Sequence, residues 1–242
     1  MPVDVSVLHI LRDGLTQYGL PADPERLEKF FIYLKEIDWW SQRMNLIGLR
    51  DHREIIIKDF LDSLSCREGW DFSQPCKVAD IGSGAGFPGL PLKLCYPNFT
   101  LVITEASVKK SEFLQHVAGL LKLDGVTILP KRAEDVGKDP QYRGQFDVVL
   151  SRAVAPLPIL VELCLPLVKI GGRLVAQKSQ AAEEEVKSAG EAITLLGGKV
   201  LEVKPVTVPF LEASRNLVLI EKIAETPEKF PRKSGIPQKR PL

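Results

Sequence analysis

The chain has 242 residues, 45% of them hydrophobic, and its 32 Lys and Arg against 31 Asp and Glu give a formal net charge of +1. This length and apolar content allow a full α/β core with a smaller appendage, and they exclude an intrinsically disordered chain. The cysteines, Cys66, Cys76, Cys95 and Cys164, form no Cys-x-x-Cys pair, so the sequence indicates neither a zinc site nor a disulfide framework.

No apolar run approaches the length of a membrane span, and the N-terminus lacks the basic and apolar regions of a signal peptide. We therefore expect a cytoplasmic protein that works without a membrane and without a metal ion.

Residues 1–72 are predicted to form an N-terminal helical region. Apolar side chains recur there at helical spacing, at Val7, Leu8, Leu11, Leu15, Leu27, Phe30, Phe31, Leu34, Ile56, Phe60 and Leu64. No strand pattern interrupts them.

From residue 77 onward, short apolar runs alternate with amphipathic helices, a pattern typical of a mainly parallel sheet. We expect strands at 78–81, 101–104, 127–129, 147–150 and 174–177, with Gly171-Gly172 as a turn before the last of these. Two further runs, 199–203 and 217–222, lack a crossover helix between them and predict a closing antiparallel hairpin. The sheet domain is expected to cover 73–224.

The most informative motif lies between Asp80 and Gly89, where glycines recur at alternate positions after a short strand. Such a loop lets the backbone approach a ligand closely. The dinucleotide fingerprint would need its third glycine at position 87, which is Phe87 here. The motif instead resembles the first motif of S-adenosylmethionine-dependent methyltransferases, and the closing hairpin is typical of their Rossmann-like sheet.

Polar residues follow four predicted strand ends, where ligands bind in an open α/β sheet. The loop 82–87 follows the first strand, and Glu105 ends the second, where a carboxylate would accept hydrogen bonds from ribose hydroxyls. Residues 132–135 could bind an adenine ring through a backbone N–H and an acidic side chain. Arg152 places a cation after the fourth strand, where its planar fork could hold the methionine carboxylate.

Each feature also has a purely structural interpretation. Glu105 could be an acid favoured by the start of a helix, and residues 132–135 could be an exposed charged turn. Four suitable strand ends in the required order favour a cofactor site.

Several runs together carry a more specific likeness: 44–46, 60–64, 80–92, 109–114, 132–135, 151–155 and 171–178. They resemble the RsmG (GidB) family, bacterial-type enzymes that methylate guanine N7 in 16S ribosomal RNA. The resemblance implies S-adenosyl-L-methionine as cofactor and 16S ribosomal RNA or the small ribosomal subunit as partner. It implies a cofactor site formed by Gly82, Phe87, Glu105, Ala106, Ser107, Ala133, Glu134 and Arg152.

The family often has a histidine at the position of Asp59, so this residue receives no role. We also assign no catalytic residue. Guanine N7 carries a lone pair in the neutral base, so direct in-line methyl transfer needs no general base and depends on holding the reacting atoms in place. Residues 151–154 lack the Asn/Asp-Pro-Pro-aromatic motif of amino-group methyltransferases, and no cysteine lies near them.

Three alternatives stay open. A small-molecule methyltransferase would share the same cofactor motifs, a nicotinamide dehydrogenase would share the fold, and a noncatalytic RNA-binding protein could keep a nucleotide-binding fold. The tail 225–242 favours RNA, because residues 228–242 carry five Lys and Arg against one Glu. Its prolines are expected to keep it outside the core.

Overall fold

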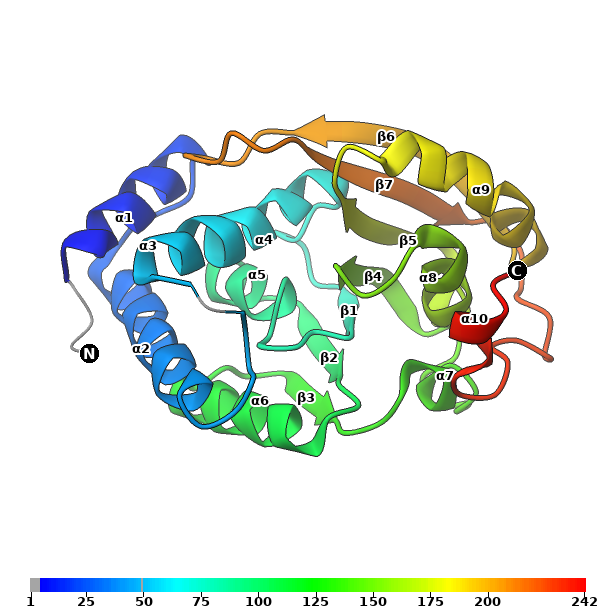
Figure 1. The fold of residues 1–242 in the computed structure, drawn as a ribbon, viewed down its shortest axis with the longest axis horizontal. Helices are drawn as coiled ribbons and strands as arrows, with labels where there is room; N and C mark the ends of the chain where they lie inside the picture. The colour runs from blue at the N-terminus through cyan, green and yellow to red at the C-terminus, as the bar shows by residue number, and fades with distance from the viewer. Residues whose placement is uncertain (1–4, 49) are drawn as a thin grey trace.

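The structure is a computed structural model that describes residues 5–48 and 50–242 (Figure 1). Residues 1–4 and 49 of the predicted helical region lie outside this description. The described residues before β1 form helices and no strand, as the apolar spacing predicts. These elements are η1 (Val5–Val7), α1 (Leu8–Gln17), α2 (Pro24–Ser41), α3 (His52–Ile55), the π-helix η2 (Ile56–Leu61), α4 (Asp62–Leu64) and η3 (Ser65–Gly69).

Local signals set the helix starts. Asp23 accepts a hydrogen bond from the Arg26 N–H at 2.9 Å, and Pro24 occupies the first turn of α2. Asp51 and Glu54 form a capping box at the start of α3. Both patterns satisfy backbone N–H groups that have no partner within the helix.

Seven strands form one sheet in the order β3-β2-β1-β4-β5-β7-β6. Their bounds are β1 (Lys77–Ile81), β2 (Thr100–Thr104), β3 (Val126–Leu129), β4 (Phe146–Arg152), β5 (Val168–Lys178), β6 (Gly198–Val206) and β7 (Arg215–Lys222). The first five strands are parallel, and β7 runs antiparallel between β5 and β6. The predicted α/β class with a closing hairpin is confirmed.

The fifth strand differs from the prediction. It begins at Val168, and Gly171-Gly172 lie inside it and not in a turn before it. The pairing with β4 jumps from Phe146↔Val168 to Val148↔Arg173, so the intervening residues of β5 bulge out. A Cβ on Gly172 would lie 2.7 Å from the Asp147 carbonyl oxygen, which explains why the bulge requires glycine there.

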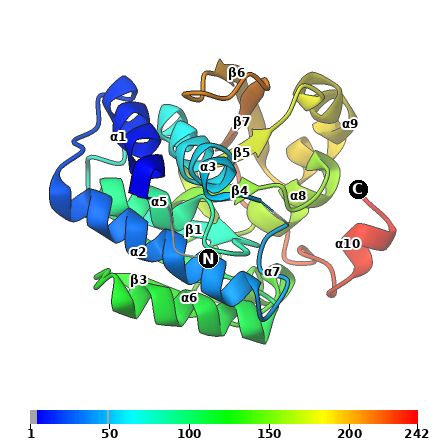
Figure 2. The same cartoon turned by 60° about the vertical axis from the view of Figure 1, so that its left-hand side comes forward.

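Helices cover both faces of the sheet (Figure 2). After β1 they are α5 (Gly89–Cys95), α6 (Val108–Leu120), α7 (Ala133–Val136), α8 (Leu157–Cys164), α9 (Ala182–Leu195) and α10 (Ile236–Lys239). One core joins α1, α2, α5 and α6 to Val78, Leu101 and Val148, and a second joins α8 and α9 to Ala79 and Val149. Adjacent strand residues thus face opposite layers.

The N-terminal helices share the first of these cores with the sheet: Leu15, Phe30 and Tyr33 are fully buried in the same cluster as Ile103. None of the helices in the described part of the chain is long and apolar enough to cross a membrane.

The expectation that the tail lies outside the core is wrong. Phe230 is 4% exposed and packs in the second core, and Pro237 is buried. Helix α10 lies beside α8 (Figure 1). The prolines exclude a long helix or strand, but they do not prevent an irregular segment from packing.

Candidate functional site

The glycine-rich loop follows β1, at the edge of the sheet where the parallel strands end. Gly82, Gly84 and Gly86 have φ angles of 69°, 61° and 99°, a region that side chains disfavour. A Cβ on Gly86 would clash with the Tyr33 hydroxyl and the Leu90 side chain, whereas a Cβ on Gly84 would meet nothing within 4 Å. The backbone at Gly84 is therefore open to a ligand.

Helix α2 packs against this loop and hydrogen-bonds to it. The fully buried Tyr33 donates a hydrogen bond through its hydroxyl to the Ala85 carbonyl. Its ring stacks on Phe60 and lies 5.8 Å from the ring of Phe87, centroid to centroid. The N-terminal helices thus position the loop, which the sequence did not predict.

Asp80 lies beneath the loop and is fully buried. Its Oδ2 accepts hydrogen bonds from the Ser83 hydroxyl and the Gly89 N–H, both at 2.8 Å. Its Oδ1 is also buried and has no hydrogen-bond partner among the described residues. Burial raises the pKa of Asp80 to about 6 against these two hydrogen bonds.

Glu105 follows β2, and its carboxylate joins the first two strand ends. Oε2 accepts from the Gly84 N–H at 3.0 Å, and Oε1 accepts from the Ser107 N–H at 2.8 Å. A carboxylate has about four acceptor positions, so two remain for ribose hydroxyls. Ser107 caps α6 by accepting from the Lys110 N–H, and Ala106 between them is exposed.

Ala133 and Glu134 form the first turn of α7, next to β3. Glu134 is only 3% exposed, and its Oε1 accepts a hydrogen bond from the Gly235 N–H of the tail at 3.0 Å. The acid expected beside the adenine therefore also contacts the C-terminal segment, 101 residues away in the sequence.

Arg152, at the end of β4, is not the free cation that the sequence suggests. Nη2 donates to Asp59 Oδ1 at 2.7 Å, and Nη1 donates to Asp62 Oδ2 at 3.2 Å and to the Lys58 carbonyl at 2.7 Å. Burial by itself would lower the pKa of Arg152, but the charges of Asp59 and Asp62 outweigh it and raise the pKa. The guanidinium lies 4.9 Å from the centre of the Phe87 ring.

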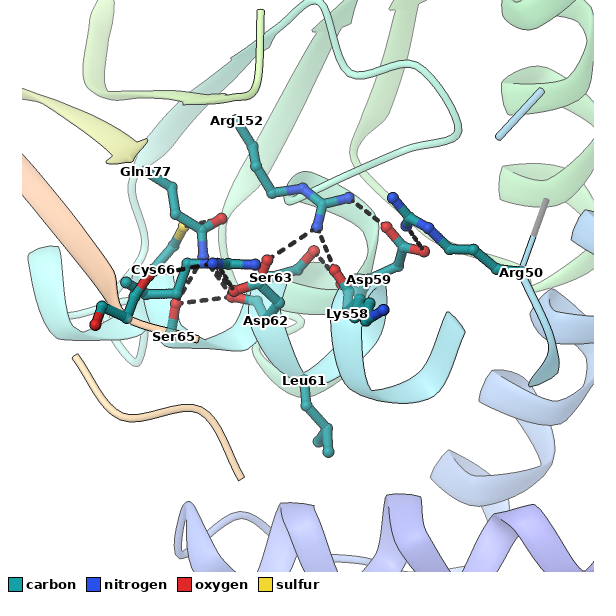
Figure 3. Close-up of polar contacts among 12 residues, drawn as sticks. Arg50, Lys58, Asp59, Leu61, Asp62, Ser63, Ser65, Cys66, Arg152 and Gln177 are labelled. Atoms are coloured by element: carbon teal, nitrogen blue, oxygen red, sulfur yellow. Dashed lines mark hydrogen bonds and ion pairs between the residues drawn. The ribbon is translucent and has the colours of Figure 1, made fainter. Parts of the chain in front are cut away.

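Two buried aspartates, Asp59 and Asp62, connect three arginines in this region, of which Figure 3 labels Arg50 and Arg152. Asp59 pairs with Arg50 at 2.5 Å as well as with Arg152. Asp62 accepts from Arg215 Nε at 2.9 Å in addition to Arg152.

Gln177, at the end of β5, completes this network. Its Nε2 donates to Asp62 Oδ1 at 2.9 Å and to the Ser65 hydroxyl at 3.0 Å. Burial raises the pKa of Asp62, although Arg152 and Arg215 oppose the shift.

Sequence reasoning gave Asp59 and Asp62 no role. Their signal is weak: two acids within a run of buried apolar residues at 55–64. Asp59 lies in the π-helix η2 and Asp62 is the next helical residue, at the start of α4, and both carboxylates reach Arg152 at the end of β4. Single π-helical turns often occur at functional sites.

A pocket of about 500 Å³ is lined by Arg152, whose guanidinium lies over the Phe87 ring of the loop. Val154 lines it and would touch a Cβ on Gly82. Its charged lining consists of Arg50, Lys58, Arg152, Lys178 and Arg215 with Asp62 and Glu185. Cations thus outnumber acids around this cavity, which Arg152 and Val154 connect to the candidate cofactor loop.

The thiol of Cys66 and the imidazole of His116 do not line the pocket beside Arg152. Cys66 is buried near Gln177, and burial raises the pKa of its thiol. His116 pairs with Glu36 at 2.9 Å in an exposed position. Within residues 5–48 and 50–242, no cluster of three or more His, Cys, Asp or Glu could hold a metal ion.

Solved structures share the fold. A structure described as a SAM-dependent methyltransferase from Aquifex aeolicus has a TM-score of 0.51 and 18% identity, covering 70% of this chain and 93% of its own. A predicted O-methyltransferase from Agrobacterium tumefaciens has a TM-score of 0.51 and 19% identity, covering 69% and 82%.

The sheet, the alternate glycines and Glu105 together define an S-adenosylmethionine-dependent methyltransferase. The buried Asp80 oxygen without a donor and the open backbone at Gly84 fit such a cofactor.

The sequence comparisons place the chain within this class. A model of the GidB family, described as rRNA small subunit methyltransferase G, matches residues 26–218. The Ribosomal RNA small subunit methyltransferase G of Roseiflexus castenholzii is 49% identical over 227 residues, 94% of this chain and 96% of that protein. The protein of the same name from Bacillus cytotoxicus is 42% identical over 228 residues, 94% and 95%. The chain belongs to the GidB family, as its motifs suggest.

Proposed function

We propose that this protein methylates guanine N7 in 16S ribosomal RNA by direct in-line transfer without a general base. The observation that carries the proposal is the cationic pocket of about 500 Å³, which is lined by Arg152 and Val154, the residues that contact Phe87 and Gly82 of the glycine loop. The names of the relatives, which specify ribosomal RNA of the small subunit, supply the substrate class. We propose the cytoplasm as its location, because bacterial ribosomal subunits reside there.

The cofactor site would use the residues that the motifs single out. The open backbone at Gly84 approaches the ligand, Gly82 begins the turn of the same loop, and Glu105 accepts the ribose hydroxyls. Ala106 and Ser107 follow Glu105 and would line the ribose side of the cofactor site, and the buried Phe87 would form another wall of it. Ala133 and Glu134 hold the adenine.

Arg152 would still contact the methionine carboxylate, although with fewer donors than expected. An arginine has five N–H donors, and three are used by Asp59, Asp62 and the Lys58 carbonyl. One on Nη2 and the one on Nε remain. The two aspartates fix the guanidinium plane, so its orientation is set before the ligand arrives.

When bound, S-adenosylmethionine supplies an electrophilic methyl group on sulfur. The chain's own residues then have three tasks: to hold the guanine with its N7 lone pair facing that methyl, to exclude water, and to attract phosphates. Arg50, Lys58 and Arg215 line the cationic pocket, and their charges suit the attraction of phosphates. No proton has to leave the guanine, so no base is required.

The proposal is tested by methyl transfer from labelled S-adenosylmethionine to small ribosomal subunits, naked 16S RNA and a pool of metabolites. Borohydride reduction followed by aniline cleaves RNA at 7-methylguanosine and locates the product. Labelled RNA without cleavage would place the methyl on another atom, and labelled metabolites would favour the small-molecule alternative. Cofactor binding with no acceptor would favour a noncatalytic RNA-binding protein.

A further inference from the structure

The C-terminal segment 226–242 is bound to the sheet domain by side chains that include Arg143, Glu162 and Glu134. Arg143, in the loop before β4, donates to the carbonyls of Thr226 and Phe230, each at 2.7 Å. Pro231 packs against Gly137, where a Cβ would meet its Cγ at 2.9 Å. The segment thus has a defined seat beside α7.

The second fastening is a buried ion pair. Glu162 on α8 is 0% exposed. Within the described part of the chain, its carboxylate accepts hydrogen bonds only from Arg232, through the backbone N–H at 2.8 Å, Nε at 2.9 Å and Nη2 at 2.5 Å. A buried carboxylate needs such a partner, so α8 depends on the tail.

The third fastening reaches the candidate cofactor site. The Gly235 N–H donates to Glu134 Oε1 at 3.0 Å, and Glu134 is only 3% exposed. Gly235 is the N-cap of α10 and has a φ of 81°, a left-handed conformation that favours glycine. Oε2 of Glu134 accepts no hydrogen bond from the residues that the structure describes, which leaves it available to a ligand.

We propose that Gly235 is a positioning residue of the cofactor site: its N–H fixes Oε1 of Glu134, so that Oε2 accepts a hydrogen bond from the exocyclic amino group of adenine. The inference rests on the proposed function, which places Glu134 beside the adenine. The tail is then part of the site and not only an RNA-binding appendage.

The test compares two probes by calorimetry: S-adenosylhomocysteine, and S-inosylhomocysteine, in which a carbonyl oxygen replaces the adenine amino group. We expect the wild type to prefer the adenine compound by on the order of ten-fold, as for a hydrogen bond to a charged group. A chain ending at Ser234 keeps Phe230 and Arg232 but loses Gly235, and it should lose most of this preference. The matched control, K239A/R240A in the full chain, removes two charges of the deleted segment and should keep it.

A second variant tests the same idea without truncation. In Glu134→Gln the Gly235 N–H should hold the amide oxygen and turn the NH₂ group toward the ligand, so the preference should reverse toward S-inosylhomocysteine. Retained preference for adenine in this variant, or in the chain ending at Ser234, would overturn the role of Gly235. A wild type that does not distinguish the probes would instead overturn the assignment of Glu134 to adenine.

Discussion

Among single residues, Glu105 links the most parts of the cofactor site, since it accepts from Gly84 and Ser107 while keeping room for a ribose. We expect Glu105→Ala to weaken S-adenosylhomocysteine binding by roughly 1–3 kcal/mol, the cost of losing hydrogen bonds to a charged group. Calorimetry measures it, with the exposed Glu112→Ala on α6 as control. Equal affinities for the two variants would leave Glu105 as a helix-start acid.

Asp80 makes a prediction about pH. Burial raises its pKa from 3.8 to about 6, so the folded protein binds this proton more tightly than the unfolded chain. The free energy of unfolding should therefore fall as pH rises from about 4 to 6, by up to ~3 kcal/mol for this group. Asp80→Asn should remove that slope in urea unfolding measured across this range.

The control for this slope is Asp71, whose pKa is lowered by hydrogen bonds from Ser73. Its stabilising contribution is lost as pH falls, so Asp71→Asn should change the pH profile in the opposite sense. A stability difference between wild type and Asp80→Asn that does not vary with pH contradicts the prediction.

At the scale of elements, α3 and the π-helix η2 that follows it carry one carboxylate each, Glu54 and Asp59, with very different surroundings. Asp59 is 1% exposed and bonded to Arg50 and Arg152, whereas Glu54 forms an exposed i,i+4 pair with Lys58. We expect Asp59→Ala to cost about 3–5 kcal/mol of stability, because it leaves Arg152 without its main charge partner. Glu54→Ala should cost much less, since water screens the pair with Lys58 and the variant loses only the long 3.4 Å hydrogen bond from the Asp51 N–H in the capping box. Similar urea midpoints for the two variants would contradict the difference.

The pairing of α8 with the tail makes a parallel prediction. Arg232→Ala leaves Glu162 buried and unpaired, and we expect a loss of about 3–5 kcal/mol. Arg240→Ala removes the same side chain from an exposed position in the same segment and should have little effect. Thermal unfolding compares the two variants directly. Equal melting temperatures would mean that water reaches Glu162.

The contrast between elements also shows what the sequence could reveal. The strand pattern, the turn at the glycine loop and the position of Glu105 after β2 depend on neighbours within a few residues, and these features match the described fold. The role of Glu105 in the cofactor site stays a prediction. Asp59 with Arg152 and Glu134 with Gly235 are contacts between residues 93 and 101 apart. The chain has many acids and many cations, and nothing local indicates which pairs meet. The long β5 was missed for a related reason: glycines that usually make a turn also permit a bulge.

For the whole molecule, the structure divides the tail charges into two groups. Arg232 is paired with Glu162, whereas Lys233, Lys239 and Arg240 are exposed and form no hydrogen bond or ion pair through their side chains with the described residues. If each of the three contacts a phosphate, their combined replacement by alanine should reduce the salt dependence of binding to single-stranded RNA by about 0.7 per contact. The melting temperature should stay unchanged. An unaltered salt slope would mean that the three cations remain solvated.

The contacts of the tail with α7 and α8 also affect the order in which the protein folds during translation. Gly235 is translated after all seven strands, so the sheet can assemble while Glu134 still lacks its donor and Glu162 still lacks Arg232. A nascent chain that has completed β7 would leave Glu134 and Glu162 without these donors, and the packing of the tail would then supply them. The contact that distinguishes adenine from hypoxanthine would therefore form only after the sheet has assembled.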